Sequence, residues 1–67
     1  MDAQAKMRRV DDLLNDIATN IGKLMCQGFF TFEESMKILK AISDKETEWM
    51  ERNFSDTEIQ EFMNNKW

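Results

Sequence analysis

The side chains of this sequence that could do chemistry are few, and their spacing does not favour catalysis. Histidine is absent, which removes the commonest general base and the commonest metal ligand together. The single cysteine, Cys26, has no imidazole to activate it. It also falls where a helix is expected to end, so the helix dipole disfavours its thiolate. We interpret Cys26 as a structural or surface thiol.

Carboxylates are the remaining candidates for chemistry. Glu33 with Lys37 and Glu48 with Arg52 are spaced four residues apart, which is the spacing of ion pairs on solvated helix faces. Paired acid and base groups need a shielded cleft, which a chain of 67 residues has difficulty building. Neither a DxDxDG calcium loop nor a CxxC pair occurs. The sequence therefore predicts no enzyme, no metal site and no cofactor.

The charge of the chain is acidic and unevenly distributed. Nine basic and thirteen acidic residues give a net charge of −4, and the whole excess lies in residues 29–67. Within that part, residues 44–61 carry seven acidic side chains against Lys45 and Arg52. Phosphate binding needs a basic surface, so this segment repels nucleic acid. We do not expect direct binding of nucleic acid.

Two features favour a cytoplasmic protein. A single cysteine cannot form a disulfide within the chain, which suits a reducing compartment. No apolar stretch approaches the roughly 18 residues that a membrane span requires. Asp11 and Asp12 follow Val10 directly, so the beginning of the chain lacks the continuous apolar run of a signal peptide. We expect no membrane association.

The first helix has the clearest pattern. Its apolar residues are spaced alternately three and four apart, and they are Met7, Val10, Leu14, Ile17, Ile21 and Leu24. This a/d alternation predicts a helix over residues 3–27 with one continuous seam for another helix. We expect Gly28 to end the helix in the left-handed conformation.

A capping box marks the start of the second helix. Thr31 is followed three residues later by Glu34, so each side chain can satisfy the other residue's backbone amide. The pattern predicts a helix over residues 32–53. Neither glycine nor proline interrupts it, and we expect it to continue through Ser43 without a break. A kink at Ser43, which begins a further capping-box match with Glu46, is the alternative.

A second capping box marks the start of a short third helix. Ser55 and Glu58 have the same spacing as Thr31 and Glu34, and Phe54 and Ile59 occupy the positions of a hydrophobic staple. The pattern predicts a helix over about residues 56–65. Strand-like alternation is absent, so the predicted fold class is all-α.

These elements predict a single small domain, residues 1–67, in which two long helices form an antiparallel hairpin and a short helix follows. A lone hairpin leaves part of its apolar surface uncovered, and the short third helix cannot cover all of it. We therefore expect a homodimer that completes a helical bundle through the seam from Met7 to Leu24. A monomeric three-helix bundle and a higher oligomer are the alternatives.

The C-terminal part of the chain is the predicted binding surface for another protein. Aromatic and methionine anchors surrounded by carboxylates suit docking to a larger, basic protein. The anchors are Trp49, Phe62, Met63 and Trp67, and the rim is Glu48, Glu51, Glu58 and Glu61. This interpretation assigns the core to the first helix and the first half of the second. The alternative is that Trp49 and Phe62 close the end of the hairpin.

The predicted function is a non-catalytic interaction module, a small regulator, adaptor or inhibitor. A different class remains as the alternative. The chain would then be a nucleic-acid-associated factor, acting as an acidic mimic of phosphate or as a degenerate helix-turn-helix.

Overall fold

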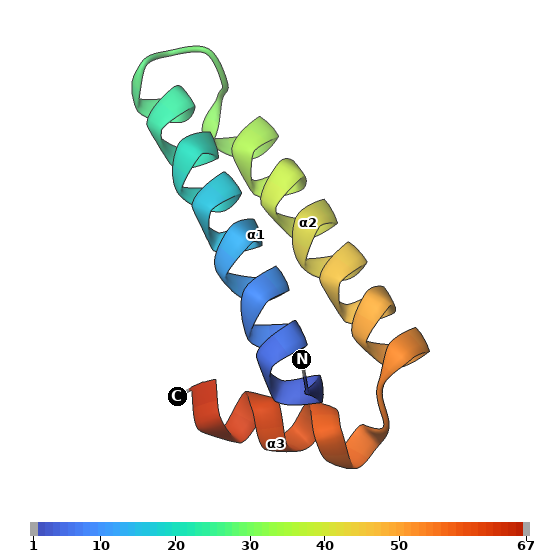
Figure 1. Ribbon diagram of the computed structural model, residues 1–67. Helices are drawn as coiled ribbons and strands as arrows, with labels where there is room; N and C mark the ends of the chain where they lie inside the picture. The colour runs from blue at the N-terminus through green and yellow to red at the C-terminus, as the bar shows by residue number, and fades with distance from the viewer. Residues whose placement is uncertain (1, 67) are drawn as a thin grey trace.

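The computed structural model describes residues 2–66, and over that range it consists of three helices without a strand. They are α1 (Ala3–Cys26), α2 (Phe32–Asn53) and α3 (Asp56–Lys66). The all-helical class is confirmed, and each helix begins and ends within one residue of its expected bound. α1 and α2 lie side by side and run in opposite directions, while α3 crosses the end that carries the N-terminus (Figure 1). None of these helices is long and apolar enough to cross a membrane.

α1 ends in a Schellman motif. Gly28 has a φ of 85°, a conformation that glycine adopts without strain. The Gly28 amide donates to the carbonyl of Met25, and the Phe29 amide donates to the carbonyl of Leu24, both at 3.0 Å. These two hydrogen bonds satisfy carbonyls that the helix end would otherwise leave without donors. The expected role of Gly28 is confirmed.

Both capping boxes form. The Glu34 amide donates to the Thr31 hydroxyl at 3.1 Å, and the Thr31 amide donates to the Glu34 carboxylate at 2.9 Å. At the start of α3, the Glu58 amide donates to the Ser55 hydroxyl at 3.2 Å, and the Ser55 amide donates to the Glu58 carboxylate at 2.9 Å. α2 continues through residue 43, as expected. Side-chain chemistry close in sequence therefore sets where α2 and α3 begin.

The hydrophobic core lies at the junction of the three helices. Met7, Met50 and Phe62 are 0%, 5% and 3% exposed. The half-buried side chains around them are Ala3, Trp49, Phe54 and Ile59. The expectation that the core belongs to the first helix and the first half of the second is wrong. Two helices alone leave large apolar side chains partly exposed, and only at the junction does α3 supply the third wall.

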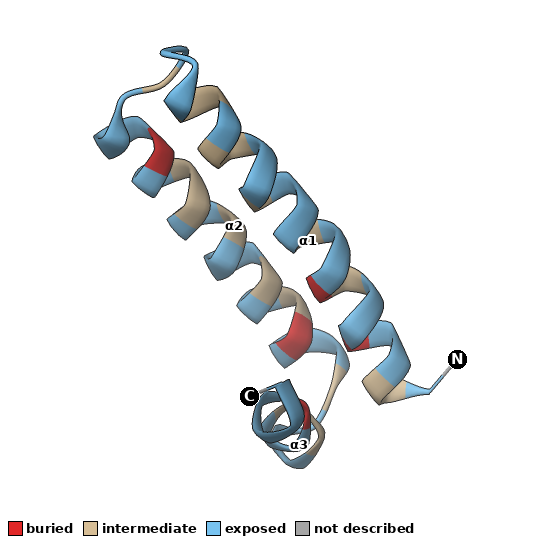
Figure 2. Ribbon diagram, turned by 90° about the vertical axis from the view of Figure 1, so that its left-hand side faces the viewer, coloured by how far each residue is buried: buried red, intermediate tan, exposed pale blue. Residues whose placement is uncertain are grey.

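The rest of the α1–α2 pair is thin. The molecule measures 40 × 19 × 17 Å, and its radius of gyration is 13.7 Å. We call residues 14–42 the loop half. Among them the only buried residue is Ser35, and the apolar side chains are half-buried or exposed (Figure 2). The loop half is therefore held by partial contacts rather than by a core.

Candidate interaction surface

An apolar stripe runs along α1 beside the face that packs against the other helices. Met7 and Asp11 mark the packed face, because both are buried at the junction. At about 3.6 residues per turn, the stripe is centred roughly a quarter of a turn from that face. The stripe consists of Val10, Leu13, Leu14, Ile17, Ile21 and Leu24. Leu13 and Ile17 are 47% and 46% exposed.

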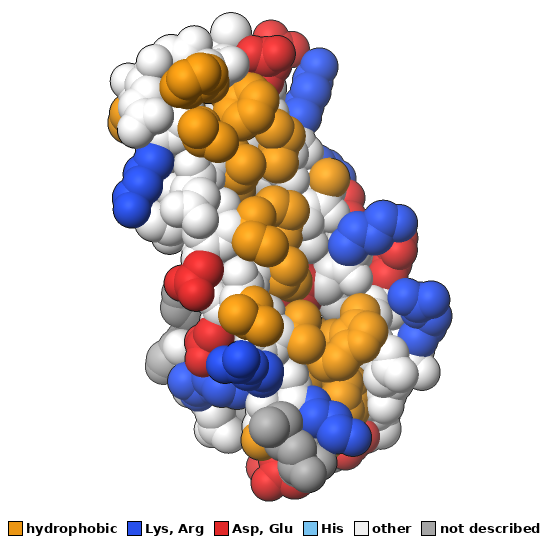
Figure 3. All heavy atoms as spheres, turned by 45° about the horizontal axis from the view of Figure 1, so that its top comes forward, with side chains coloured by type: hydrophobic (Ala, Val, Ile, Leu, Met, Phe, Trp, Pro, Cys, Tyr) orange, Lys and Arg blue, Asp and Glu red, His pale blue; other side chains and the backbone are white. Residues whose placement is uncertain are grey.

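The stripe belongs to a larger apolar surface. Figure 3 shows hydrophobic side chains in a continuous band on one face of the α1–α2 pair, with side chains of both charges along its borders. Aliphatic side chains this exposed in the middle of a long helix are available to a partner. A contiguous apolar surface of this kind marks an interaction site in many proteins.

The residues predicted for self-association divide between two places. Val10, Leu14, Ile17, Ile21 and Leu24 belong to the apolar stripe, where none is fully buried. Met7 differs, because it is enclosed by Met50 and Phe62 at the junction. A side chain with no exposed surface cannot contact a partner, so Met7 is corrected from the seam to the core.

The two aromatic anchors that the structure describes, Phe62 and Trp49, pack against the core instead of forming an exposed docking surface. Phe62 is buried in the core, and Trp49 is half-buried against it, with its ring 5.2 Å from the Phe54 ring at 75°. Met63 is exposed, and Trp67 lies outside the described residues. Phe62 is therefore corrected from a binding anchor to a core residue. The physical reason is that α3 turns its apolar face inward to close the junction.

The predicted acidic rim is spread over different roles. The Glu58 carboxylate caps α3, and Glu48 pairs with Lys45 at 3.4 Å. Glu51 and Glu61 are exposed. Among the described anchors, Phe62 and Trp49 pack inward, so these two rings do not join the carboxylates in an exposed site.

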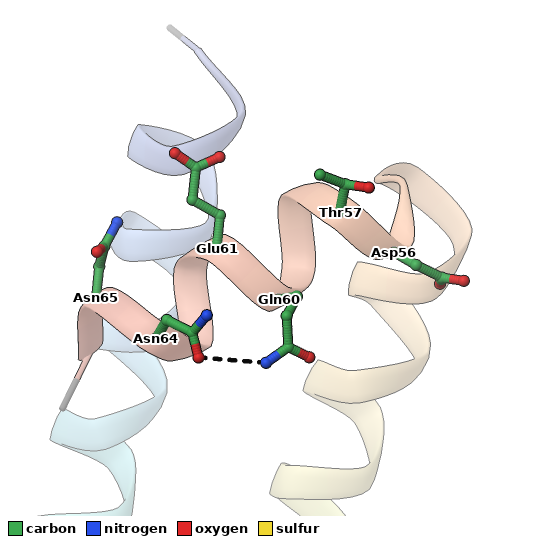
Figure 4. A pocket seen from close by; sticks show the side chains of 6 residues that line it. All are labelled: Asp56, Thr57, Gln60, Glu61, Asn64 and Asn65. Carbon is green, nitrogen blue, oxygen red and sulfur yellow. Dashed lines mark hydrogen bonds between the residues drawn. The ribbon is translucent and has the colours of Figure 1, made fainter.

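The outer face of α3 carries an open polar depression, which Figure 4 shows. Its side chains form two rows that point in different directions, Asp56, Gln60 and Asn64 in one and Thr57, Glu61 and Asn65 in the other. Gln60 donates to Asn64 at 3.2 Å along one row. Nothing in this arrangement converges on a point where a substrate atom could sit. Across residues 2–66, no group of three or more His, Cys, Asp or Glu side chains could hold a metal ion.

A polar cluster ties the three helices together at the junction. Lys66 of α3 donates to Asp11 of α1 at 2.9 Å, and Asn15 donates to the other carboxylate oxygen at 3.2 Å. The carboxyl group of Glu46, on α2, lies beside that of Asp11, so the two can form a hydrogen bond when one of them carries a proton. One Glu46 oxygen is buried without a donor. A proton on Glu46 resolves this, since the neutral acid can donate to ionised Asp11.

The environment moves the pKa values of the two carboxyl groups apart. Burial, the hydrogen bond to Asp11 and the negative charge of Asp11 together raise the pKa of Glu46 to about 7, against the opposing charge of Lys66. Burial also acts to raise the pKa of Asp11, but hydrogen bonds from Lys66, Glu46 and Asn15 outweigh it and hold that pKa below its ordinary value. The pair therefore holds one proton between the two pKa values, up to about pH 7.

Sequence reasoning missed this cluster, although it left a signal. Asp11 lies four residues after Met7, and Glu46 lies four residues after Ile42, so each carboxyl group interrupts the inward face of its helix. The cluster lies between the three helices, and this position suits a structural contact that holds the helices together. Comparisons of the chain with protein-family models, with curated proteins and with solved structures find no match. The proposals that follow therefore rest on the geometry of this chain.

Proposed function

We propose that the protein is a non-catalytic interaction module, a regulator, adaptor or inhibitor that binds protein chains through the apolar stripe of α1. The observation that carries this proposal is the position of the stripe. It lies beside the packed face of α1, and it leaves Leu13 and Ile17 nearly half exposed at the middle of the helix. In this proposal the α1–α2 pair is a helical hairpin that presents the stripe to a partner.

The spacing of the stripe supports a helical contact. Its members follow the anchor positions of a helix that packs against a groove or against another helix. Covering the exposed parts of Leu13 and Ile17 would contribute about 1 kcal/mol each. Small gains of this size, added over the stripe, are sufficient to hold a partner only if the whole helix face is covered.

The proposed surface differs from the C-terminal one expected from the sequence. Phe62 and Trp49 contribute to the core, so removing them would test stability rather than binding. The acidic side chains of α2 and α3 remain available to orient a partner. The apolar contact itself is assigned to α1.

A site-specific photo-cross-linker tests the proposal. Placed at Ile17 in cells that produce the protein, it should form protein adducts that survive nuclease treatment of the lysate. The same cross-linker at Met36 is the matched control, because Met36 is an equally exposed apolar residue, at 50%, on the outer surface of α2. Equal adducts at both positions, or none at Ile17, would contradict the proposal. Nuclease-sensitive adducts would favour the nucleic-acid alternative.

A further inference from the structure

The surface area of the chain is larger than a compact monomer of its mass exposes. The chain has an accessible surface of 5178 Å² at a mass of 8.0 kDa. A typical folded monomer of this mass exposes about 4,500 Å², so the excess is about 700 Å². Each partner in a standard protein interface buries about 800 Å². The excess is thus close to the area that one subunit of a stable dimer covers.

The shape of the molecule locates this excess. A compact chain of this length has a radius of gyration of about 11 Å, whereas the observed value is 13.7 Å. The difference comes from the α1–α2 pair, which runs along the 40 Å long axis of the molecule, while α3 covers only one end (Figure 1). The uncovered length of α1 carries the apolar stripe.

The stripe has the geometry of a surface that can pack against itself. Leu13 and Ile17 are its two most exposed members, one helical turn apart, on either side of the midpoint of α1. A two-fold axis through that midpoint sets Leu13 against the partner's Ile17, and Ile17 against the partner's Leu13. The alternating spacing of three and four residues is also the spacing with which helices pack against like helices.

The charges beside the stripe are compatible with a second copy. Side chains of both signs border the apolar band in Figure 3, so neither a basic nor an acidic partner is favoured by charge alone. α1 itself carries equal numbers of acidic and basic side chains when its Asp2 cap is included. Two copies of α1 therefore bring no net charge to the contact.

We infer that the occupant of the apolar stripe is a second copy of this chain, with α1 packed antiparallel to the partner's α1 about a two-fold axis between Leu13 and Ile17. This inference rests on the proposed function, because it names the partner of the same surface. The resulting dimer is a bundle of four long helices with an α3 at each end. It buries in one contact the surface that each chain alone leaves exposed.

Sedimentation equilibrium of the full chain, from micromolar to near-millimolar concentration, tests the inference. The wild-type chain should have twice the 8.0 kDa mass of the monomer. Ile17→Glu should weaken the association by about 100-fold or more, because the two-fold axis places the uncompensated charge in the interface twice. Met36→Glu should leave the association unchanged, since it adds the same charge at the same exposure away from the stripe.

Far-UV circular dichroism keeps these results interpretable. Ile17 is nearly half exposed, so the monomeric variant should remain helical. If Ile17→Glu loses its helicity, Leu13→Gln replaces it as the test variant. A wild-type chain that is monomeric throughout, a dimer that survives both stripe substitutions, or a dimer that Met36→Glu also dissociates would overturn the inference. If the chain is a monomer and the cross-linker at Ile17 still captures other proteins, the inference of a second copy is wrong. The proposed function would not be affected by that result.

Discussion

The junction and the loop half of this molecule use the same kinds of residue with different results. At the junction, α3 adds a third wall, and Met7, Met50 and Phe62 become a core. In the loop half, α1 and α2 contact each other alone, and only Ser35 is buried. Aliphatic and aromatic side chains occur in both regions. Apolar spacing along a helix therefore predicts a face that needs a neighbour, but the number of neighbours decides whether that face becomes a core.

Phenylalanine to alanine substitutions give the largest predicted contrast between the two regions. Phe62→Ala should cost about 3–5 kcal/mol, because it leaves a cavity among buried side chains. A domain of this size has a total stability of about 3–10 kcal/mol, so this variant should be largely unfolded or close to it. Phe32→Ala should change stability by less than about 0.5 kcal/mol, since the ring is 70% exposed.

Urea denaturation followed by circular dichroism measures both effects. All proteins must be compared at one concentration, because dimer formation makes stability concentration-dependent. If Phe62→Ala and Phe32→Ala lower the free energy of unfolding equally, the junction and the loop half do not differ in packing. A Phe62→Ala variant that is stable but fails to bind partners would show that Phe62 belongs to a binding surface and not to the core.

The helix ends were predictable because their causes are local. Thr31 with Glu34, and Ser55 with Glu58, form hydrogen bonds within one turn of chain. The conformation of Gly28 is equally local. The direction in which α3 leaves α2 is set by long-range packing, which spacing alone does not encode. For that reason the spacing favours a core in α1 and the first half of α2, whereas the buried apolar side chains lie at the junction.

The candidate surface was predictable in part for the same reason. The seam of α1 follows directly from the spacing of its apolar residues, and all of these residues except Met7 belong to the apolar stripe. Its rotation relative to α2 depends on tertiary contacts, so Met7 was assigned to the seam although α3 and α2 enclose it. The polar cluster was not predicted, since its members are brought together only when Lys66 reaches Asp11 across the junction.

The second prediction concerns pH and tests the polar cluster at the junction. The pKa of Glu46 is about 7 in the folded chain against an ordinary value of 4.5, so between these values the folded state holds a proton that the unfolded state has lost. Stability should therefore fall as pH rises from about 4.5 to 7, by about 1–2 kcal/mol once solvent screening is allowed for. Asp11 acts in the opposite direction, because its lowered pKa supplies stability that is lost on acidification below its ordinary value of 3.8.

Glu46→Gln isolates the contribution of that carboxyl group. The amide can donate to Asp11 at every pH, so the decline between pH 4.5 and 7 should disappear from urea midpoints measured across that range. Glu51→Gln removes the same charge from an exposed position of α2 and controls for the change in net charge. A decline that persists in Glu46→Gln would mean that another group at the junction causes it.

The smallest predicted effect concerns the loop half, where Gly22 sits inside α1. A β-carbon added at Gly22 meets nothing within 4 Å. Gly22→Ala should therefore stabilise the protein by about 1 kcal/mol. Alanine has a higher helix propensity than glycine, and it reduces the conformational entropy of the unfolded chain. Gly28→Ala, also without a neighbour within 4 Å, should destabilise it because φ is positive there. Both are read from urea midpoints at one protein concentration. Destabilisation by Gly22→Ala would show that α2 packs closely at this point and that the loop half resembles the junction more than its exposure indicates.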